Sequence, residues 1–284
     1  MYKCFRLFLF ILPSIVFVSC QNSTSSEGGV SKENQVYLPE YQQILDSLNV
    51  VGTIVVHDFQ KDVFYSNDFQ WAKRGQLPAS TFKIPNTIIG IETGVLQPDT
   101  SVFRWDGSPR AMEIWQQDLN LEQAFQYSCV PCYQEVARKI GVERMQHFLQ
   151  KLDYGDMRVD SINLDVFWLA GESRITPFQQ IDFLERFYFE KLPISVSTVE
   201  VVKSIMFLGV FQEAEIYAKT GWVSRNGLNS GWFVGFARKQ DDVLFFAVNV
   251  EPKPDFNMDE FPAVRKVIAM KALELFFDKY FKSK

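Results

Sequence analysis

The sequence predicts an α+β fold: one antiparallel sheet of about five strands, flanked by terminal helices and interrupted by an inserted helical lobe. Three observations carry this prediction. The 284 residues are 47% hydrophobic, enough to bury a sizeable core. Strand-like runs gather near the two ends of the chain, whereas helical periodicity dominates its middle. Neither two strands nor three make a stable sheet alone, so we expect the two ends to join.

The N-terminal part of the sheet is expected as a hairpin that follows a helix. In Tyr37–Leu48, apolar side chains recur at spacings of three and four, which predicts the helix. Val50–His57 is rich in valine, isoleucine and threonine, and the short run Asp62–Ser66 follows it across a polar turn. Residues 37–70 therefore form the first part of a sheet lobe.

Residues 71–207 form the predicted helical lobe. Its clearest periodic segments are Leu121–Tyr127, Tyr133–Ile140, Val142–Leu152 and Pro177–Phe189. The sheet lobe resumes over residues 208–284, where three β-rich runs predict a meander: Glu215–Trp222, Gly231–Arg238 and Val243–Val250. A final helix over Ala263–Phe281 is expected to cover one face of the sheet. Clefts form at such lobe boundaries, so we expect the site there.

Residues 1–19 have the profile of an export signal. Lys3 and Arg6 precede the apolar run Leu7–Val18, and no acidic residue interrupts it. The run is shorter than the roughly 20 residues that a membrane-spanning helix needs. We therefore expect an exported protein.

The signal ends at Cys20 in a sequence that resembles a bacterial lipoprotein box, although Phe17 stands where leucine is usual. We expect a lipid on Cys20 to anchor the protein to a membrane, with a soluble periplasmic protein as the alternative. Residues 20–36 contain few large apolar side chains, which predicts a flexible tether ahead of a domain over 37–284.

Composition disfavours several classes of function. The net charge is -5 and no basic stripe is present, which disfavours binding to nucleic acid or to an anionic membrane surface. The two histidines, His57 and His147, are too few and too isolated for a zinc hydrolase site. We therefore expect a small-molecule substrate, with no metal, no cofactor and no protein partner.

Two cysteines, Cys129 and Cys132, remain once the signal and the lipid-bearing residue are set aside. In an oxidising compartment they could form a disulfide. The loop between them is short and would strain the bridge, so we expect buried thiols. No thioredoxin-like βαβ context surrounds them, which disfavours redox catalysis.

Ser80 and Lys83 form a Ser-x-x-Lys motif at the start of an apolar segment. The position suits a serine at or just inside a helix N-terminus, with the lysine on the same face and able to take the hydroxyl proton. An ammonium with a pKa of about 10.4 cannot accept a proton at neutral pH. Lys83 must therefore be desolvated or chemically changed. By itself the motif is weak, because a capping serine beside a solvated lysine fits it equally well.

Two further motifs strengthen this interpretation. Ser128 and Val130 form Ser-x-Val at an expected helix-to-loop junction, and Lys219–Gly221 is a Lys-Thr-Gly motif on a predicted strand. There Gly221 would let a substrate backbone approach, and Lys219 with Thr220 could bind a carboxylate. In this order the three motifs resemble those of the serine penicillin-recognising enzymes.

Other segments narrow the resemblance to the class D (oxacillinase-type) β-lactamases along nearly the whole mature chain. They are Ser80–Asn86, Trp105–Gly107, Tyr154–Asp156, Phe167–Leu169 and Gly231–Gly235. Asp156 stands where that family usually has asparagine. The resemblance implies that a β-lactam acylates Ser80 and that the acyl-enzyme is then hydrolysed, which gives antibiotic resistance. It also implies that carbon dioxide carboxylates Lys83. The anionic carbamate would be the general base of both steps, which resolves the charge problem.

The resemblance also implies the remaining catalytic roles. Trp168 would hydrogen-bond the carbamate and shelter it. Ser128 would relay a proton to the lactam nitrogen as it leaves. The backbone N–H groups of Ser80 and Trp222 would form the oxyanion hole.

The substrate-binding residues implied by the resemblance are Val130, Leu169, Lys219, Thr220, Gly221 and Arg265. The first two would be apolar walls that limit water near the carbamate, and the basic and hydroxyl side chains would hold the substrate carboxylate. A surface arginine is the alternative interpretation of Arg265, because its alignment is loose by about one residue.

Two other functions share this expected fold. A penicillin sensor acylates and stays acylated, but such sensors carry several membrane-spanning segments ahead of the domain. A D,D-peptidase usually has Ser-x-Asn as its second motif, where this chain has Val130. We therefore expect a hydrolase.

Overall fold

The computed structural model describes residues 1–2, 34–225 and 227–280. Residues 34–280 belong to one compact unit, which spans Lys32–Lys284. The predicted export signal, the lipidation of Cys20 and most of the predicted tether lie outside the described residues. Gln35 and Val36, which the sequence placed in the tether, belong instead to the first strand of the sheet.

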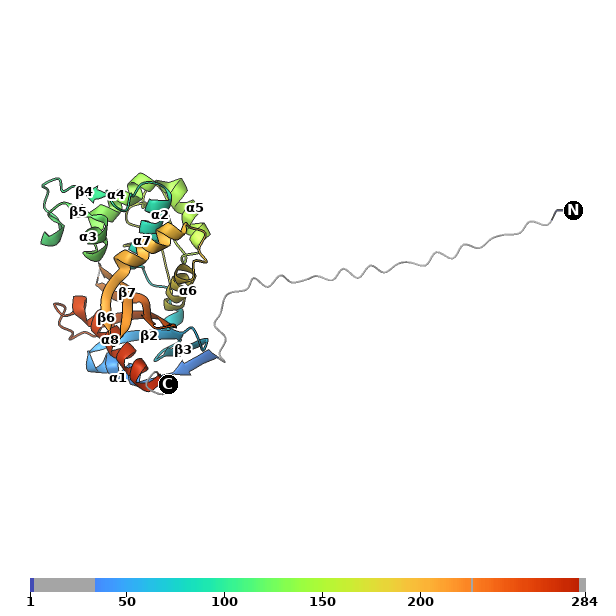
Figure 1. Cartoon of the computed structure of the whole chain (residues 1–284), viewed down its shortest axis with the longest axis vertical. Coiled ribbons are helices and arrows are strands. Elements are labelled where there is room, and N and C mark those ends of the chain that lie inside the picture. The colour runs from blue at the N-terminus through green and yellow to red at the C-terminus, as the bar shows by residue number, and fades with distance from the viewer. Residues whose placement is uncertain (3–33, 226, 281–284) are drawn as a thin grey trace. The chain divides into compact units, whose positions relative to one another are not determined.

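Seven strands form one sheet in the order β1-β3-β2-β9-β8-β7-β6 (Figure 1). Their bounds are β1 Gln35–Tyr37, β2 Val50–Asp58, β3 Val63–Ser66, β6 Phe207–Phe211, β7 Ala214–Arg225, β8 Leu228–Lys239 and β9 Asp242–Pro252. All neighbouring strands are antiparallel except β1, which runs parallel to β3. The predicted fold class is confirmed. The structure adds β1 and β6, two short edge strands, to the five strands that the sequence indicated.

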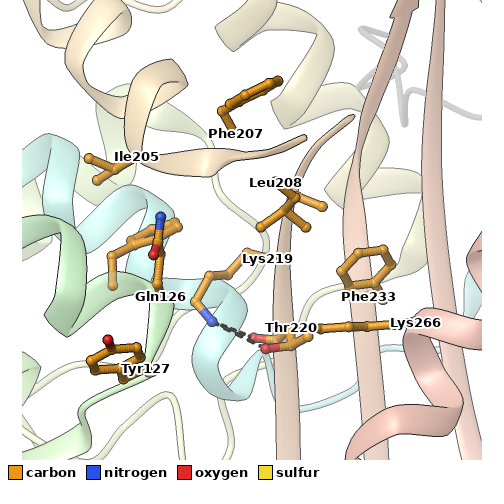
Figure 2. A pocket seen from close by; sticks show the side chains of 11 residues that line it. Gln126, Tyr127, Ile205, Phe207, Leu208, Lys219, Thr220, Phe233 and Lys266 are labelled. Atoms are coloured by element: carbon orange, nitrogen blue, oxygen red, sulfur yellow. Dashed lines mark hydrogen bonds between the residues drawn. The ribbon is translucent and has the colours of Figure 1, made fainter. Parts of the chain in front are cut away.

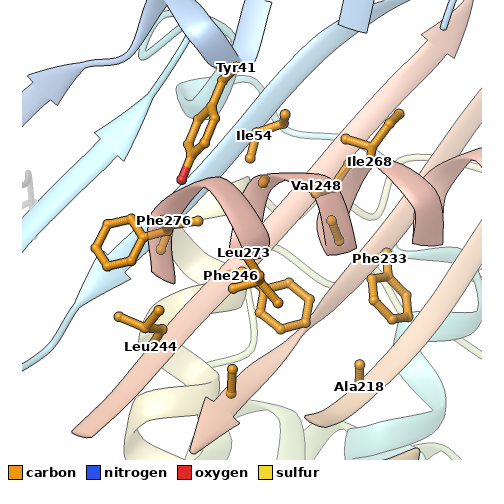
Figure 3. Close-up of a cluster of buried hydrophobic side chains, with 14 of the residues drawn as sticks. Tyr41, Ile54, Ala218, Phe233, Leu244, Phe246, Val248, Ile268, Leu273 and Phe276 are labelled. Carbon is orange, nitrogen blue, oxygen red and sulfur yellow. The ribbon is translucent and has the colours of Figure 1, made fainter. Parts of the chain in front are cut away.

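The helices at the two ends of the domain cover one face of this sheet. They are α1, Pro39–Ser47, and α8, Phe261–Tyr280. Figure 3 shows the core between them and the sheet, where Leu273 and Phe276 of α8 meet Phe246 and Val248 of β9. Alternate side chains of a strand point to opposite faces, so each strand of the pair β8 and β9 supplies every second residue to this core.

Helix α6, Pro177–Tyr188, packs on the opposite face of the sheet. Tyr188 contacts Phe236 of β8 and Phe245 of β9, with ring centroids 5.0 and 5.7 Å apart. Phe245 is adjacent in sequence to Phe246 of the α8 core, so it points the other way. The sequence assigned this helix to the helical lobe, but it is the layer that joins that lobe to the sheet.

The helical lobe is built around α2, which contacts α4, α5 and α7. Its helices are α2 Lys83–Glu92, α3 Leu121–Gln126, α4 Val130–Ile140, α5 Val142–Leu152 and α7 Val196–Met206, and a small β4–β5 hairpin pairs Val102–Phe103 with Leu119–Asn120. All side chains from Lys83 to Gly90 are buried, because neighbouring helices surround α2. Within the described ranges, no helix has the length and apolar character needed to cross a membrane.

Candidate functional site

Ser80 lies on a tight turn that leads directly into α2. Residues Ala79–Phe82 form a short 3-10 helix, η3, and Lys83 continues it with helical backbone angles. The serine therefore sits at a helix start, as the sequence predicts. Ala79 has a φ of 50°, in the left-handed region that costs a residue with a Cβ about 1 kcal/mol. Its N–H donates to the carbonyl of Trp168 at 2.8 Å, which stabilises this conformation.

Lys83 is fully buried and its Nζ donates to Ser80 Oγ at 3.0 Å. Burial lowers the pKa of Lys83 from 10.5 to about 7. The ring of Tyr133 lies under the amine, 5.0 Å from Nζ. An amine with this pKa is substantially neutral at physiological pH, so it can accept a proton or react as a nucleophile. The desolvation that the sequence required is present.

Lys219 brings a second serine to the same place. It is on β7, and its Nζ donates to Ser128 Oγ at 2.5 Å and to the Thr220 carbonyl at 3.1 Å. Figure 2 shows the bonds to Thr220 at the wall of a pocket beside β7. Burial lowers the pKa of Lys219 well below 10.5, and the positive charges of Lys83 and Arg265 lower it further. The third motif therefore contacts the second motif at Ser128, and it lies near enough to the first motif for the charge of Lys83 to act on Lys219.

The outer edge of β7 meets the Ser80 turn. Strand β6 pairs with β7 only as far as Tyr217, and η3 lies against the rest of that edge. A Cβ on Gly221 would lie 3.0 Å from the Pro78 carbonyl and 3.2 Å from Thr81 Cγ2. Glycine is therefore needed here for the protein's own turn, and not only for a substrate as the sequence suggested. The close approach brings the backbone of Trp222, the next residue, near the same turn.

Arg265 of α8 is buried, with 6% of its surface exposed, so the surface alternative is wrong. One guanidinium nitrogen donates to the Gly221 carbonyl and the other to the Pro262 carbonyl. Burial lowers the pKa of Arg265 from 12.5 to about 10, and the side chain stays charged. The arginine reaches Gly221 by passing over Gly231, where a Cβ would lie 2.5 Å from Arg265 Cδ. The absence of a side chain at Gly231 therefore leaves the space that the Arg265 side chain occupies.

Trp168 is fully buried and stacks on Phe82, with ring centroids 5.3 Å apart. Its Nε1–H has no hydrogen-bond acceptor among the described residues. Such a buried donor is costly unless something accepts its hydrogen bond. Val130 begins α4 two residues after Ser128, and Leu169 follows Trp168; both side chains are half-buried.

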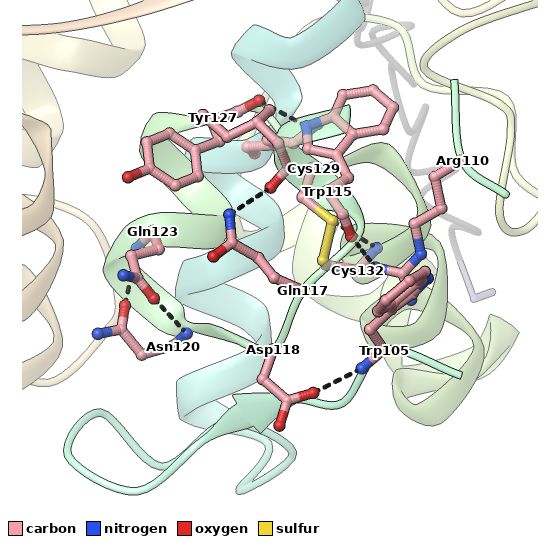
Figure 4. The surroundings of a disulfide bond; sticks show 12 residues. Trp105, Arg110, Trp115, Gln117, Asp118, Asn120, Gln123, Tyr127, Cys129 and Cys132 are labelled. Atoms are coloured by element: carbon pink, nitrogen blue, oxygen red, sulfur yellow. Dashed lines mark hydrogen bonds between the residues drawn. A yellow bond between two sulfur atoms is a disulfide. The ribbon is translucent and has the colours of Figure 1, made fainter. Parts of the chain in front are cut away.

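A disulfide joins Cys129 and Cys132, so the expectation of buried thiols is wrong (Figure 4). The sequence argument treated the segment as a short loop. In fact Cys129 caps α4, and the first helical turn places the two Cα atoms 5.4 Å apart, within the ordinary range for a disulfide. The bridge follows directly after Ser128, whose φ is 54°. Trp115 also ties this segment, because its indole N–H donates to the Tyr127 carbonyl at 2.9 Å.

One buried residue of the site region was missed by the sequence analysis. Gln180 of α6 is fully buried and its Nε2 donates to Thr81 Oγ1, next to Ser80, at 2.9 Å. A signal was available: the glutamine lies on the apolar stripe of a predicted helix, together with the buried Pro177, Ile181 and Leu184. A polar residue in such a position has a buried partner.

Comparisons with known proteins agree with this geometry. The profile of the penicillin binding protein transpeptidase domain family matches residues 54–273. β-Lactamase OXA-10 of Pseudomonas aeruginosa is 38% identical over 263 residues, which cover 91% of this chain and 95% of the relative. β-Lactamase OXA-48 of Klebsiella pneumoniae is 40% identical over 200 residues, covering 70% of this chain and 75% of the relative.

Solved structures decide the class. The class D β-lactamase YbXI from Nostoc superposes with a TM-score of 0.78 at 37% identity, covering 82% of this chain and 97% of the other. The class D β-lactamase FUS-1 (OXA-85) from Fusobacterium nucleatum subsp. polymorphum also gives 0.78, at 32% identity, over 86% and 99%. The chain belongs to the class D β-lactamase family.

In this class D β-lactamase the disulfide lies at the second motif, where it joins the N-cap of α4 to the first turn of that helix. Closing a loop of this length removes unfolded-chain entropy worth about 2 kcal/mol. We predict that Cys129→Ser with Cys132→Ser lowers the free energy of unfolding by about that amount and slows acylation, because Ser128 is less firmly held. Thermal unfolding and burst kinetics measure the two effects.

A reductant should lower the melting temperature of the wild-type protein but not that of the double variant. Equal melting temperatures for the two proteins without reductant would contradict the prediction.

Proposed function

We propose that this protein hydrolyses the β-lactam ring of penicillin-type antibiotics through an acyl-enzyme on Ser80. The observation that carries the proposal is the contact between the buried Lys83 amine and Ser80 Oγ, at 3.0 Å. A base able to be neutral, placed against a hydroxyl at a helix start, is the arrangement that a serine nucleophile needs. The activity named for its relatives, β-lactamase, is the reaction that this arrangement supports.

The surroundings of Lys83 fit its carboxylation by carbon dioxide. The amine is buried and its pKa is lowered to about 7, so the neutral form that reacts with carbon dioxide is well populated. The indole N–H of Trp168, which no acceptor among the described residues occupies, offers a donor to an anion in this buried region. A carboxylated lysine would supply an anionic oxygen as general base.

The other residues position the substrate and move its protons. Ser80 Oγ attacks the lactam carbonyl, and the backbone N–H groups of Ser80 and Trp222 stabilise the developing oxyanion. Ser128, held by Lys219, delivers a proton to the lactam nitrogen as the ring opens. Thr220, Lys219 and the buried Arg265 give the substrate carboxylate a positive environment. Val130 and Leu169 are apolar walls that limit water near the carboxylated Lys83.

Turnover by the purified domain tests the proposal. At a large excess of benzylpenicillin we expect many turnovers per enzyme, because the acyl-enzyme is hydrolysed. We expect Lys83→Ala to lose turnover by at least about 10²-fold, the scale of a general base, while it keeps the fold. Release of product, followed spectrophotometrically, measures both. A single stoichiometric burst from the wild-type protein would instead make it a sensor or a slow D,D-peptidase.

The pH dependence tests carboxylation. Below a pH of about 7 the Lys83 amine is protonated and cannot react with carbon dioxide, so activity should fall as pH decreases through that value. Added bicarbonate should shift the fall to lower pH by mass action. We expect Trp168→Phe, which removes only the indole donor and part of the ring, to require more bicarbonate for full activity. Bicarbonate titrations at pH 6 and pH 8 measure this, and equal requirements in the two proteins would refute the role of Trp168.

We further propose that the chain is exported to the periplasm and anchored through a lipid on Cys20. The support is the sequence of residues 1–20, with its basic start, apolar run and terminal cysteine. We expect Cys20→Ser to move the activity from the membrane fraction to the soluble periplasmic fraction, while Cys4→Ser changes nothing. If the activity of the wild-type protein is already in the soluble fraction, the protein is not lipidated and the proposed anchor is wrong.

A further inference from the structure

A closed ring of buried polar groups lies behind the Ser80 turn. Gln180 Nε2 donates to Thr81 Oγ1 at 2.9 Å, Tyr154 Oη donates to Gln180 Oε1 at 3.2 Å, and the two hydroxyl oxygens lie 3.2 Å apart. The three side chains are almost completely buried. They come from α6, from the segment after α5 and from η3, so the ring joins three parts of the chain.

The positions of the protons in this ring require a side chain at Gln180 that both donates and accepts a hydrogen bond. The Thr81 hydroxyl gives its one proton to the Pro78 carbonyl, at 2.7 Å. The Tyr154 phenol, whose pKa is raised by burial, keeps its proton and gives it to Gln180. Thr81 therefore receives its hydrogen bond from Gln180. Only a side chain that donates on one side and accepts on the other satisfies both neighbours.

Thr81 in turn closes the turn that carries the nucleophile. Its N–H and its hydroxyl both donate to the Pro78 carbonyl, at 3.2 and 2.7 Å. Ser80 and the left-handed Ala79 lie inside this loop. A hydroxyl that rotated away from Pro78 would release the turn on which the position of Ser80 depends.

Helix α6, which carries Gln180, is held in place by contacts with the sheet. One and a half turns along the helix, Glu185 contacts Nδ1 of the buried His57 on β2. Arg186 donates to the Leu152 carbonyl at 2.8 Å, and Tyr188 packs on the sheet. On one side of Gln180 the helix is thus held to the sheet through Glu185 and Tyr188, and to the end of α5 through Arg186. Strand β7 of the same sheet supplies Lys219 and Gly221.

We propose that Gln180 is a positioning residue for the reaction. It holds Thr81 so that the hydroxyl and the backbone N–H of Ser80 stay aligned with Lys83 and with the edge of β7. Gln180 touches none of these reacting groups itself. The inference rests on the proposed function, because its readout is the acylation of Ser80.

Gln180→Leu tests the proposal against a matched control in the preceding residue. Gln179 is exposed, and among the described residues its side chain bonds only within the cap of α6, accepting from Thr176 N–H at 2.9 Å. We expect Gln180→Leu to slow acylation by about 10²-fold, the scale of a small misplacement, while the dissociation constant of the initial complex stays within about twofold. Gln179→Leu should leave both unchanged. Stopped-flow bursts with a chromogenic cephalosporin separate the two constants.

Gln180→Glu provides a second test, which can still be made if the Gln180→Leu protein fails to fold. A neutral carboxylic acid can donate through its O–H to one neighbour and accept through its carbonyl from the other, as the amide does with its NH2 and carbonyl groups, whereas the ionised form has no donor. Burial favours the neutral form at low pH. The ratio of variant to wild-type acylation, at saturating bicarbonate, should therefore be near one at low pH and fall as the pH rises.

The outcomes are distinct. A folded Gln180→Leu protein that acylates at the wild-type rate, or one whose initial binding weakens as much as its rate, would overturn the positioning role. A flat pH ratio for Gln180→Glu would overturn it as well. A wild-type protein that reacts neither with the cephalosporin nor with benzylpenicillin would overturn the proposed function instead.

Discussion

The burial of one amine, that of Lys83, is the constraint around which the rest of the structure is organised. An ammonium in an apolar interior is unfavourable, and the protein lowers this cost by letting the group lose its proton. The amine can be buried because α2 is surrounded on all sides by α4, α5 and α7. The helical lobe therefore does more than enclose a core: it keeps water from the amine that, in the proposed function, activates Ser80.

Around Lys219 of the sheet, three basic side chains from different elements lie close together. Lys219, Arg265 and Lys83 are close enough for each other's charges to lower the pKa of Lys219. The described residues hold no carboxylate in hydrogen-bond contact with Lys219, which bonds Ser128 and Thr220 instead. A substrate carboxylate would relieve this repulsion, so binding energy and proton placement come from the same residues.

Rigidity at the site comes from cross-links and close approaches within the chain itself. The disulfide holds the segment after Ser128, and the ring of Gln180, Thr81 and Tyr154 holds the turn of Ser80. Two glycines set the approach distances, Gly221 between β7 and the turn and Gly231 beneath Arg265. Donors and nucleophiles fixed in this way need little reorganisation during the reaction, which is the main source of electrostatic catalysis.

Local patterns in the sequence indicated five of the seven strands of the sheet, the helices with a clear apolar stripe and the motif residues Ser80, Lys83, Ser128 and Lys219. Such features depend on residues a few positions apart, whose spacing directly reflects backbone geometry. The edge strands β1 and β6 were missed because none of their residues is fully buried, so they show no alternation of buried apolar and exposed polar residues.

Only the tertiary structure decided the features that join distant segments. The Cys129–Cys132 bridge depended on where α4 begins, the burial of Arg265 on the absence of a side chain at Gly231, and the role of Gln180 on Thr81, 99 residues away. Nothing in the neighbouring residues encodes such a contact, because it forms only when the whole chain packs. The sequence thus specified the reactive groups, and the packing specified their distances and their protonation.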